Sequence, residues 1–478
     1  MTEMRDSRPA KRSRWLLLAV SISGVLAGLD GTAVVIAAPN IAQTVHASPI
    51  QLQWITNSYL VALAVGLLPA GRFVDRVGAR RGFVLGVALF GLLSLPIALA
   101  TSATMLITLR AAQGLAGALM QPAAMALLRV TFPPPRLNPA IGVLTAATAA
   151  SAAGGPIIAG TIVEHFGWPA VFLLNLPFAL VTALLGRWSA AGSRGDEAPR
   201  PPARAVLRLP GIGFGVLLVT ASYFAIYGLL FVLTLYLQNL RGLDPVAAGL
   251  WLLPLSAVVV LSAPLGGVLT TRYGAPRPAL AGMALVVVTL AGLSTVDDET
   301  TLAGFAPIAL LGGTGAGIAL VAGTQAIIGV APTALSGLAS AVQQTVSQLG
   351  GVLGIGVLGA VLSWRVGEVL PAELDHAALP EDLVRRTLDN TGDVAQGTVP
   401  VPPATTDSVA AALTAAGRQA FLEGLHTSLL VAALVTAVGS VLAAMIRSTA
   451  ESAGPPDTTS DVDNEGGNQQ RTHHKRVQ

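Results

Sequence analysis

Twelve long apolar segments dominate this chain of 478 residues and restrict what it can fold into. A helix needs about 20 predominantly apolar residues to cross a bilayer, and within lipid it satisfies its own backbone hydrogen bonds. Only 11% of the residues are charged, whereas soluble domains carry about 25%. The sequence therefore predicts an all-α polytopic membrane protein with twelve transmembrane helices. The predicted spans lie near residues 15–37, 50–70, 83–101, 104–128, 138–163, 168–187, 210–237, 246–270, 278–295, 302–328, 335–363 and 424–446.

The residue inventory excludes several kinds of chemistry. Cysteine is absent, so disulfides, thiol catalysis and cysteine metal sites are excluded. The two lysines, Lys11 and Lys475, lie in polar tails, so the chain has no P-loop lysine for ATP hydrolysis. No His, Asp and Glu residues cluster within the spans. We therefore expect no enzymatic activity, no cofactor and no metal site.

Basic residues are distributed unevenly between the loops. If the N-terminus is cytoplasmic, 22 of the 28 Lys and Arg residues fall on the cytoplasmic side, and the short loops of the other side hold only Arg241. Short cytoplasmic loops carry such an excess of positive charge. We therefore expect a cytoplasmic (inner) membrane protein of a bacterium with both termini in the cytoplasm. Because the basic residues follow the loops, nothing in the sequence indicates nucleic-acid binding.

A short internal repeat divides the chain into two halves. "GRFVDRVGARR" begins at Gly71 after the second span, and "GVLTTRYGAPR" begins at Gly267 after the eighth. Parallel repeats are typical of transporters whose substrate site lies between the halves. The predicted parts are a cytoplasmic tail (1–14), a six-helix bundle (15–187), a Pro-rich cytoplasmic linker (188–208), a second six-helix bundle (209–446) with a long outer loop (364–422), and a disordered cytoplasmic tail (447–478).

Two charged residues lie deep within predicted spans, Asp30 in the first and Arg110 in the fourth. An ionised side chain at the bilayer centre costs about 2.5–3.5 kcal/mol on insertion scales, so such a residue faces a partner, a cavity or a proton pathway. Burial favours the neutral form of a carboxyl group, and a nearby cation favours the ionised form. If these effects alternate with conformation, Asp30 takes up a proton on one side and releases it on the other. The alternative is a static ion pair with Arg110.

Four segments resemble a known family of transporters. "LDGTAVVIAAP" (29–39), "GRFVDRVGARRG" (71–82), "LRAAQGLAGA" (109–118) and "SAAGGPIIAG" (151–160) resemble, in this order, motifs of the major facilitator superfamily. The chain is most similar to the drug:proton antiporters of the EmrB/QacA type. Members of that group usually have fourteen helices, whereas residues 188–208 are too short for the extra pair. The resemblance implies the major facilitator fold with two six-helix bundles.

The resemblance also implies roles for individual residues. Asp30 is implicated in proton coupling, with Arg110 on the fourth helix as the charge that tunes it. The loop after the second span implies a conformational latch between the halves; a solvated basic loop is the alternative. Small residues and a proline in the fifth span favour a hinge for alternating access, or merely close packing. The predicted latch residues are Gly71, Asp75, Arg76, Gly78, Arg80 and Arg81, and the predicted hinge residues are Gly155, Pro156 and Gly160.

Polar and aromatic side chains within the spans are candidates for a substrate cavity. For any one of them, a hydrogen bond between helices is the alternative role. On the predicted eleventh helix, Gln344, Ser347 and Gly351 belong to one polar stripe. The candidates are Trp54, Asn57, Tyr59, Gln113, Tyr236, Gln238, Gln325 and Gln344.

These observations lead to one expected function with one alternative. We expect a monomeric proton-coupled antiporter in the lipid bilayer that exports lipophilic drugs or antibiotics by alternating access. Its partners are the small-molecule drug and protons. Because Asp30 is the only deep acid, neutral or zwitterionic drugs should be at least as good substrates as dications. The alternative is a proton-coupled symporter that imports a small metabolite on the same fold.

Overall fold

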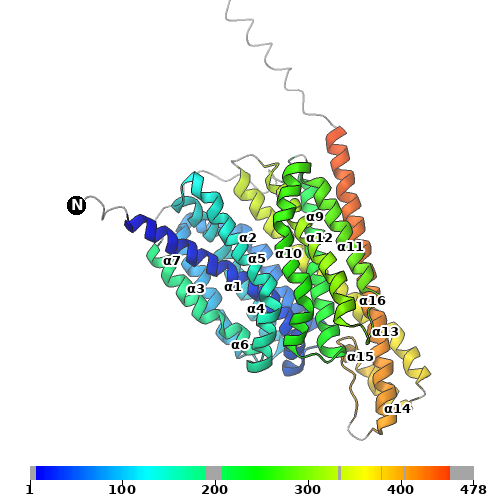
Figure 1. Ribbon diagram of the computed structural model, residues 1–478. Helices are drawn as coiled ribbons and strands as arrows, with labels where there is room; N and C mark the ends of the chain where they lie inside the picture. The colour runs from blue at the N-terminus through cyan, green and yellow to red at the C-terminus, as the bar shows by residue number, and fades with distance from the viewer. Residues whose placement is uncertain are drawn as a thin grey trace, which may run out of the picture.

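The computed structural model describes residues 7–189, 207, 209, 211–331, 335–377, 379–402 and 405–452. Figure 1 shows two groups of long helices side by side, the first half of the chain in blue to cyan and the second in green to red. Most of the predicted linker and tails lies outside the described residues. The first half contains α1 (Ser7–Val45), α2 (Pro49–Val77), α3 (Ala79–Ala98), α4 (Ala103–Thr131), α5 (Pro134–Phe166), α6 (Trp168–Leu173) and α7 (Asn175–Ser189). The second contains α9 (Ile212–Leu235), the π-helical turn η1 (Tyr236–Leu240), α10 (Pro245–Tyr273), α11 (Pro276–Leu293), α12 (Leu302–Ile328), α13 (Ser336–His376), α14 (Glu381–Asp389), α15 (Thr391–Val394) and α16 (Asp407–Ser452).

Membrane-spanning helices account for most of this architecture. Within the described ranges, eleven helical segments are long and apolar enough to cross a membrane, α6 and α7 together forming one of them. The helix α5, 33 residues long, lies between the fourth and fifth of these segments and completes the set. The prediction of an all-α polytopic protein with twelve transmembrane helices is confirmed.

The ends of α2 and α10 show the internal repeat in the backbone. Gly78 ends α2 with φ of 90°, and Gly274 ends α10 with φ of 75°. Residues other than glycine rarely adopt this region, so each copy of the repeat uses its glycine to end a helix sharply. We call the end of the bundle with these two turns the basic end, and the opposite end, where α2 and α10 begin, the far end.

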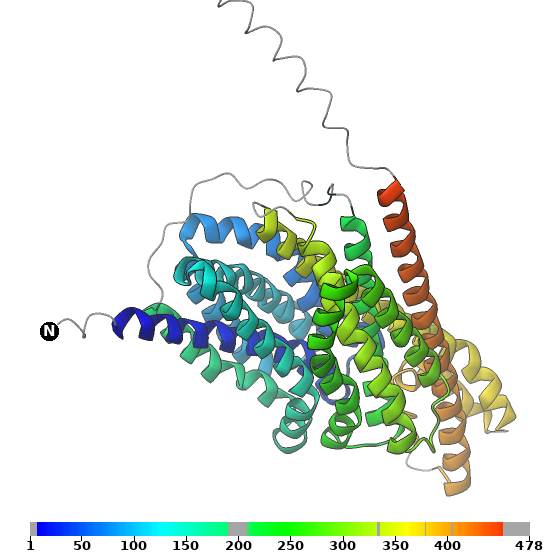
Figure 2. The same cartoon turned by 45° about the horizontal axis from the view of Figure 1, so that its top comes forward.

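Helix pairing is the same in the two halves. The helix α1 packs on α5, α2 on α4 and α3 on α7; correspondingly α9 packs on α13, α10 on α12 and α11 on α16. The main contacts between the halves are reciprocal, α5 with α10 and α2 with α13, and α1 also contacts α9. Figure 2 shows the helices of the first half strongly inclined to those of the second. The fold is therefore a pair of equivalent bundles whose shared surface runs mainly along α2, α5, α10 and α13.

Glycines let the two halves approach closely along α5 and α10. A side chain added at Gly160 would overlap the carbonyl of Pro245, and one added at Gly249 would overlap the carbonyl of Pro156. Small residues at such crossings allow backbones to touch in membrane helices. All four residues lie toward the far end, so the halves are in direct contact there.

Much of the predicted outer loop is helical. The helix α13 continues past residue 363 to His376, α16 begins at Asp407, and α14 and α15 lie between them. Val366, Leu370 and Leu374 are fully buried at a spacing of four residues, which places them on one face of the extended helix. These apolar residues continue the core beyond the predicted span and form a helical cap at the far end.

Candidate functional site

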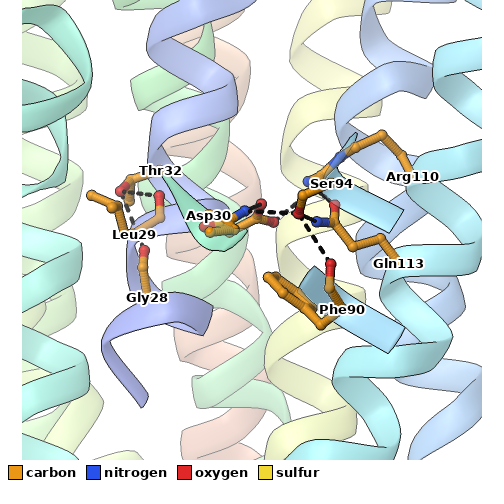
Figure 3. A network of polar contacts seen from close by, with 9 residues as sticks. Gly28, Leu29, Asp30, Thr32, Phe90, Ser94, Arg110 and Gln113 are labelled. Carbon is orange, nitrogen blue, oxygen red and sulfur yellow. Dashed lines mark hydrogen bonds and ion pairs between the residues drawn. The ribbon is translucent and has the colours of Figure 1, made fainter. Parts of the chain in front are cut away.

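The two buried charges of the sequence form an ion pair between α1 and α4. Arg110 Nη1 lies 2.7 Å from Asp30 Oδ2, and the exposed fractions of Asp30 and Arg110 are 2% and 1%. Figure 3 shows Asp30 pointing away from its own helix toward side chains of α3 and α4. Because both side chains are buried, each charge depends on the other for compensation.

Arg110 makes further contacts that hold its guanidinium in place. Its Nη1 also donates to Gln113 Oε1 at 2.5 Å, and its guanidinium carbon lies 4.3 Å from the ring centre of Tyr59 and 5.6 Å from that of Phe172. A cation over an aromatic face is stabilised electrostatically. The Nε atom of Arg110 has no hydrogen-bond partner among the described residues. The arginine therefore depends on Asp30 for its only opposite charge in this network.

Helix α2 approaches this arginine closely because α4 carries a glycine there. A side chain added at Gly114 would overlap the carbonyl of Tyr59, and one added at Gly117 would lie 3.3 Å from the Tyr59 hydroxyl. The close approach places the Tyr59 ring over Arg110. The sequence motif around Arg110 thus provides both the charge and the space for its aromatic neighbour.

A hydrogen-bond network extends from the ion pair to α3 and α7. Gln113 Nε2 donates to Ser94 Oγ at 2.9 Å, and Ser94 Oγ donates to the Phe90 carbonyl at 3.0 Å. Asn175 Nδ2 contacts Asp30 Oδ1 at 3.5 Å and Ser94 Oγ at 3.3 Å. Ser94 and Asn175 were not among the predicted site residues. Their only signal in the sequence is a single polar residue inside each of the apolar stretches "FGLLSLPIA" and "VFLLNLPFAL".

Both carboxylate oxygens of Asp30 have partners that suit its ionised form. In the ionised form, one carboxylate oxygen accepts from Arg110 and the other faces Asn175. Protonation would neutralise Asp30 and leave the buried arginine without its counter-charge. In the described part of the chain, no three His, Cys, Asp or Glu side chains gather as a metal site.

The predicted cavity residues fall into separate places. Tyr59 and Gln113 belong to the network around Arg110. Asn57 is buried on α2, and its side-chain oxygen has no partner among the described atoms. Trp54 is 49% exposed near the far end of the same helix. Of these α2 candidates, the structure brings only Tyr59 to the ion pair.

The candidates of the second half are more scattered. Gln238 Nε2 donates to the Ile36 carbonyl at 2.9 Å and so joins the halves. The Tyr236 hydroxyl donates to the Asp297 carbonyl at 2.6 Å, at the far end. Gln325 is exposed on α12, and Gln344 is half-buried on α13. None of these four lies in the network of Asp30 as the structure describes it.

The predicted latch residues surround the turn between α2 and α3. Gly71 has open space at the position of an added side chain, and Gly78 has the positive φ described above. Arg76 and Arg81 are exposed, while Arg80 donates to the carbonyl of Arg187 at the end of α7 in the same half. The side chain of Asp75 lies outside the described part of the structure. The turn is thus tied to its own bundle by Arg80.

The predicted hinge residues lie where α5 meets two other helices. An added side chain at Gly155 would overlap the hydroxyl of Thr32 on α1. The Pro156 carbonyl faces Gly249, and Gly160 faces Pro245, both on α10. This segment of α5 therefore contacts the helix of Asp30 on one side and the opposite half on the other.

Comparison with known proteins places this geometry in context. The profile of the Major Facilitator Superfamily matches residues 20–355. The chain is 34% identical to the tetracenomycin C resistance and export protein of Streptomyces glaucescens, over 90% of this chain and 91% of that protein. It is 30% identical to the multidrug efflux pump LfrA of Mycolicibacterium smegmatis, over 91% and 96% of the two chains.

Solved structures show the same fold. A bacterial homolog of the human lysosomal transporter Spinster, in an inward-facing and unoccupied conformation, matches with a TM-score of 0.74 at 20% identity. The match covers 92% of this chain and 98% of the other. The arrangement of two six-helix bundles is thus shared at low sequence identity.

Proposed function

This chain belongs to the Major Facilitator Superfamily, and we propose that it is a proton-coupled antiporter that exports lipophilic drugs or antibiotics by alternating access. Relatives that cover most of the chain are named for tetracenomycin C resistance and export and for multidrug efflux. These relatives support drug export as the function of this chain. Its proposed partners are protons and the drug, and we propose that it acts as a monomer.

The observation that carries the proposal is the buried Asp30–Arg110 pair. Removing one partner of a buried ion pair costs about 3–5 kcal/mol, because the other charge stays buried without compensation. Protonation of Asp30 has the same electrostatic effect as removing its charge. Shifting a two-state equilibrium from 1:99 to 99:1 takes about 5.5 kcal/mol. If the pair is intact in only one conformation, one proton at Asp30 therefore supplies most of the free energy that such a shift takes.

Contacts between the halves indicate which state the structure represents. Gln238 reaches the carbonyl of Ile36, Gln396 Nε2 donates to the carbonyl of Ala47 at 3.3 Å, and the α5–α10 glycine contacts lie toward the same far end. We take the basic end as cytoplasmic because of the positive-inside rule, which puts both termini inside. The structure then represents a state closed toward the outside.

The proposed cycle follows from these two points. Asp30 takes up a proton from outside when the far end opens, and the halves then rock about the α5–α10 contact. Asp30 releases the proton inward as drug binds, and the turn at Gly78 latches the halves in one state. Inward movement of one charge supplies about 2.3 kcal/mol per 100 mV, and a tenfold drug gradient costs about 1.4 kcal/mol. One proton therefore supports more than a tenfold gradient of a neutral drug.

Everted membrane vesicles test the proposal directly. Vesicles from an efflux-deficient bacterial host are energised so that the lumen becomes acidic, and drug is then added outside, at the cytoplasmic face. An antiporter releases protons from the lumen, whereas an importing symporter running in the reverse direction carries protons in with its substrate. Wild type should raise the lumenal pH and Asp30→Asn should not, while the exposed-residue control Glu164→Gln should behave as wild type. Drug-induced acidification would overturn the antiport proposal.

A drug-susceptibility panel in the same host provides the second readout. Cells that express the wild-type chain should tolerate more of at least one lipophilic drug than cells that express Asp30→Asn at equal membrane level. Equal tolerance with the two chains across the panel would remove Asp30 from the mechanism.

A further inference from the structure

The helical cap at the far end contains a cavity of about 350 Å³. It lies between the end of α13 and the short helix α14, which Figure 1 shows at the lower right edge of the molecule. At a rise of 1.5 Å per residue, Leu374 in the cavity wall lies about 16 Å beyond residue 363, where the predicted span ends. The cavity is therefore separate from the ion-pair network and from the contacts between the halves.

One face of α14 forms most of the cavity wall. The lining residues of this helix are three and four positions apart, which places them on one side of it. Two charged residues of α14 outside the wall, Asp382 and Arg386, pair with each other at 3.0 Å. The helix therefore turns a mixed apolar and charged face toward α13. The lining residues of this face are Glu381, Val384, Arg385 and Leu388.

The remaining surface of the cavity is largely apolar. Leu374 of α13 is fully buried, and Leu379, in the connection between the two helices, is half-buried. Leu388 of α14 is 37% exposed although it faces the cavity. Sites for small organic ligands are mostly apolar cavities of about 300–1,000 Å³ with a few placed polar groups. The cavity therefore has the size and the walls to hold the apolar body of a small ligand.

Three charged residues complete the wall, Asp375 of α13 and Glu381 and Arg385 of α14. All three are exposed, and none belongs to an ion pair among the described residues. Two carboxylates and one guanidinium give this cavity an excess of negative charge. Because opposite charges attract, a cationic ligand should bind here more tightly than a neutral or anionic ligand of the same shape.

We propose that this cavity binds amphipathic organic cations. The apolar body of the ligand packs on the leucines, and its ammonium group lies at Asp375 and Glu381. Since the far end faces outward in the proposed orientation, the ligand reaches the site from outside without entering the bundle. The site is separate from the proposed drug pathway, and its existence does not depend on the export function.

Three molecules with one skeleton test the choice of ligand. At pH 7, 4-phenylbutylammonium is a cation, 4-phenylbutanol is neutral and 4-phenylbutyrate is an anion. Binding to the purified full-length protein is measured by isothermal titration calorimetry in phosphatidylcholine nanodiscs, and the heat of empty nanodiscs is subtracted. The cation should bind more tightly than the alcohol, and the alcohol more tightly than the anion.

Substitutions of the charged residues should change the Kd of the cation in opposite directions. An exposed ion pair changes an affinity by about 1.4- to 5-fold. Glu381→Gln and Asp375→Asn should each raise the Kd by this factor, whereas Arg385→Gln removes a repelling charge and should lower it by this factor. Asp389→Asn is the matched control and should leave the Kd unchanged, because this exposed acid lies on α14 but outside the cavity wall.

A larger side chain tests the cavity itself. Leu379→Trp should fill the space and abolish saturable binding of the cation. Misfolding of the cap does not explain tighter binding by Arg385→Gln, so the opposite signs distinguish a charged site from a damaged one. Three results would each overturn the proposal: no saturable binding of the cation to wild type, equal Kd values for the cation and the alcohol, or a Kd that Glu381→Gln and Arg385→Gln leave unchanged.

Discussion

Replacing Asp30 by asparagine should destabilise the protein more than replacing its partner Arg110 by glutamine. Arginine stays charged in proteins, so Asp30→Asn leaves a buried cation among Gln113, Tyr59 and Phe172. We expect this variant to lose about 3–5 kcal/mol of unfolding free energy. In Arg110→Gln, Asp30 can take up a proton and become neutral, so the expected loss is about 1–3 kcal/mol, as for an unsatisfied buried polar group.

The double variant separates the ion pair from its surroundings. Asp30→Asn with Arg110→Gln removes both charges, so it should be more stable than the sum of the single losses predicts. Contacting residues show interaction energies of about 0.5–3 kcal/mol, and we expect the upper part of that range here. The assay is unfolding by sodium dodecyl sulfate in mixed micelles at pH 5, close enough to the ordinary pKa of an aspartate (about 3.9) that protonating Asp30 in Arg110→Gln costs little, followed by circular dichroism.

A surface ion pair provides the matched control. Arg386 and Asp382 of α14 lie 3.0 Å apart and are both exposed. Exposed pairs of this kind are coupled by about 0.3–0.5 kcal/mol. Equal coupling energies for the two pairs, or an Asp30→Asn variant as stable as wild type, would refute the argument from burial.

Three further predictions concern the contacts between the halves. Gly249→Leu should lower drug efflux about tenfold in expression-matched cells, because overpacking a close helix contact costs about 1–3 kcal/mol. Gly267→Leu is the control and should leave efflux unchanged, because there is open space where its side chain would lie. A side chain added at Gly359 of α13 would touch that of Gln53 on α2, so cysteines introduced at both positions should form a disulfide that mass spectrometry detects. The disulfide should stop transport until it is reduced. Unhindered transport by the linked protein would contradict the proposal that the far end must open. Gln396→Ala removes a hydrogen bond to the α1–α2 turn, which is worth about 0.5–1.5 kcal/mol. Distances between spin labels on the two sides of the far end should then show a larger open population. An unchanged distance distribution would count against a role for that contact in closing the far end.

Helix number and the central ion pair could be predicted from the sequence because both depend on strong signals. A run of about 20 apolar residues has few other folds open to it in lipid. Asp30 and Arg110 are costly inside a membrane unless they are paired, and the two lie in different spans. Their mutual contact was therefore the simplest arrangement, and the structure contains it.

The polar network around the pair could not be predicted in the same way. A serine within an apolar helix often bonds to its own backbone, as Ser23 does to the Val20 carbonyl. The sequence does not distinguish Ser23 from Ser94, which accepts from Gln113 of another helix. Only the packing of α3 and α7 against α4 and α1 brings Ser94 and Asn175 to the site.

The helical cap at the far end could not be predicted from the sequence for a different reason. Residues 364–422 contain enough charge and proline to read as a polar loop. Their apolar residues are spaced for an amphipathic helix, and Leu370 and Leu374 are fully buried. The polarity of the segment places it outside the membrane, whereas the continuation of α13 depends on which face its apolar residues occupy.

Counting protons against drug in sealed liposomes tests the central claim most directly. Purified protein is reconstituted with a pH-sensitive dye inside, and a drug gradient is imposed without any initial pH gradient. The wild-type chain should move protons opposite to the drug, and Asp30→Asn should produce no pH change. Proton movement that persists in Asp30→Asn, or drug movement by wild type without protons, would contradict an ion pair that opens and closes with the transport cycle.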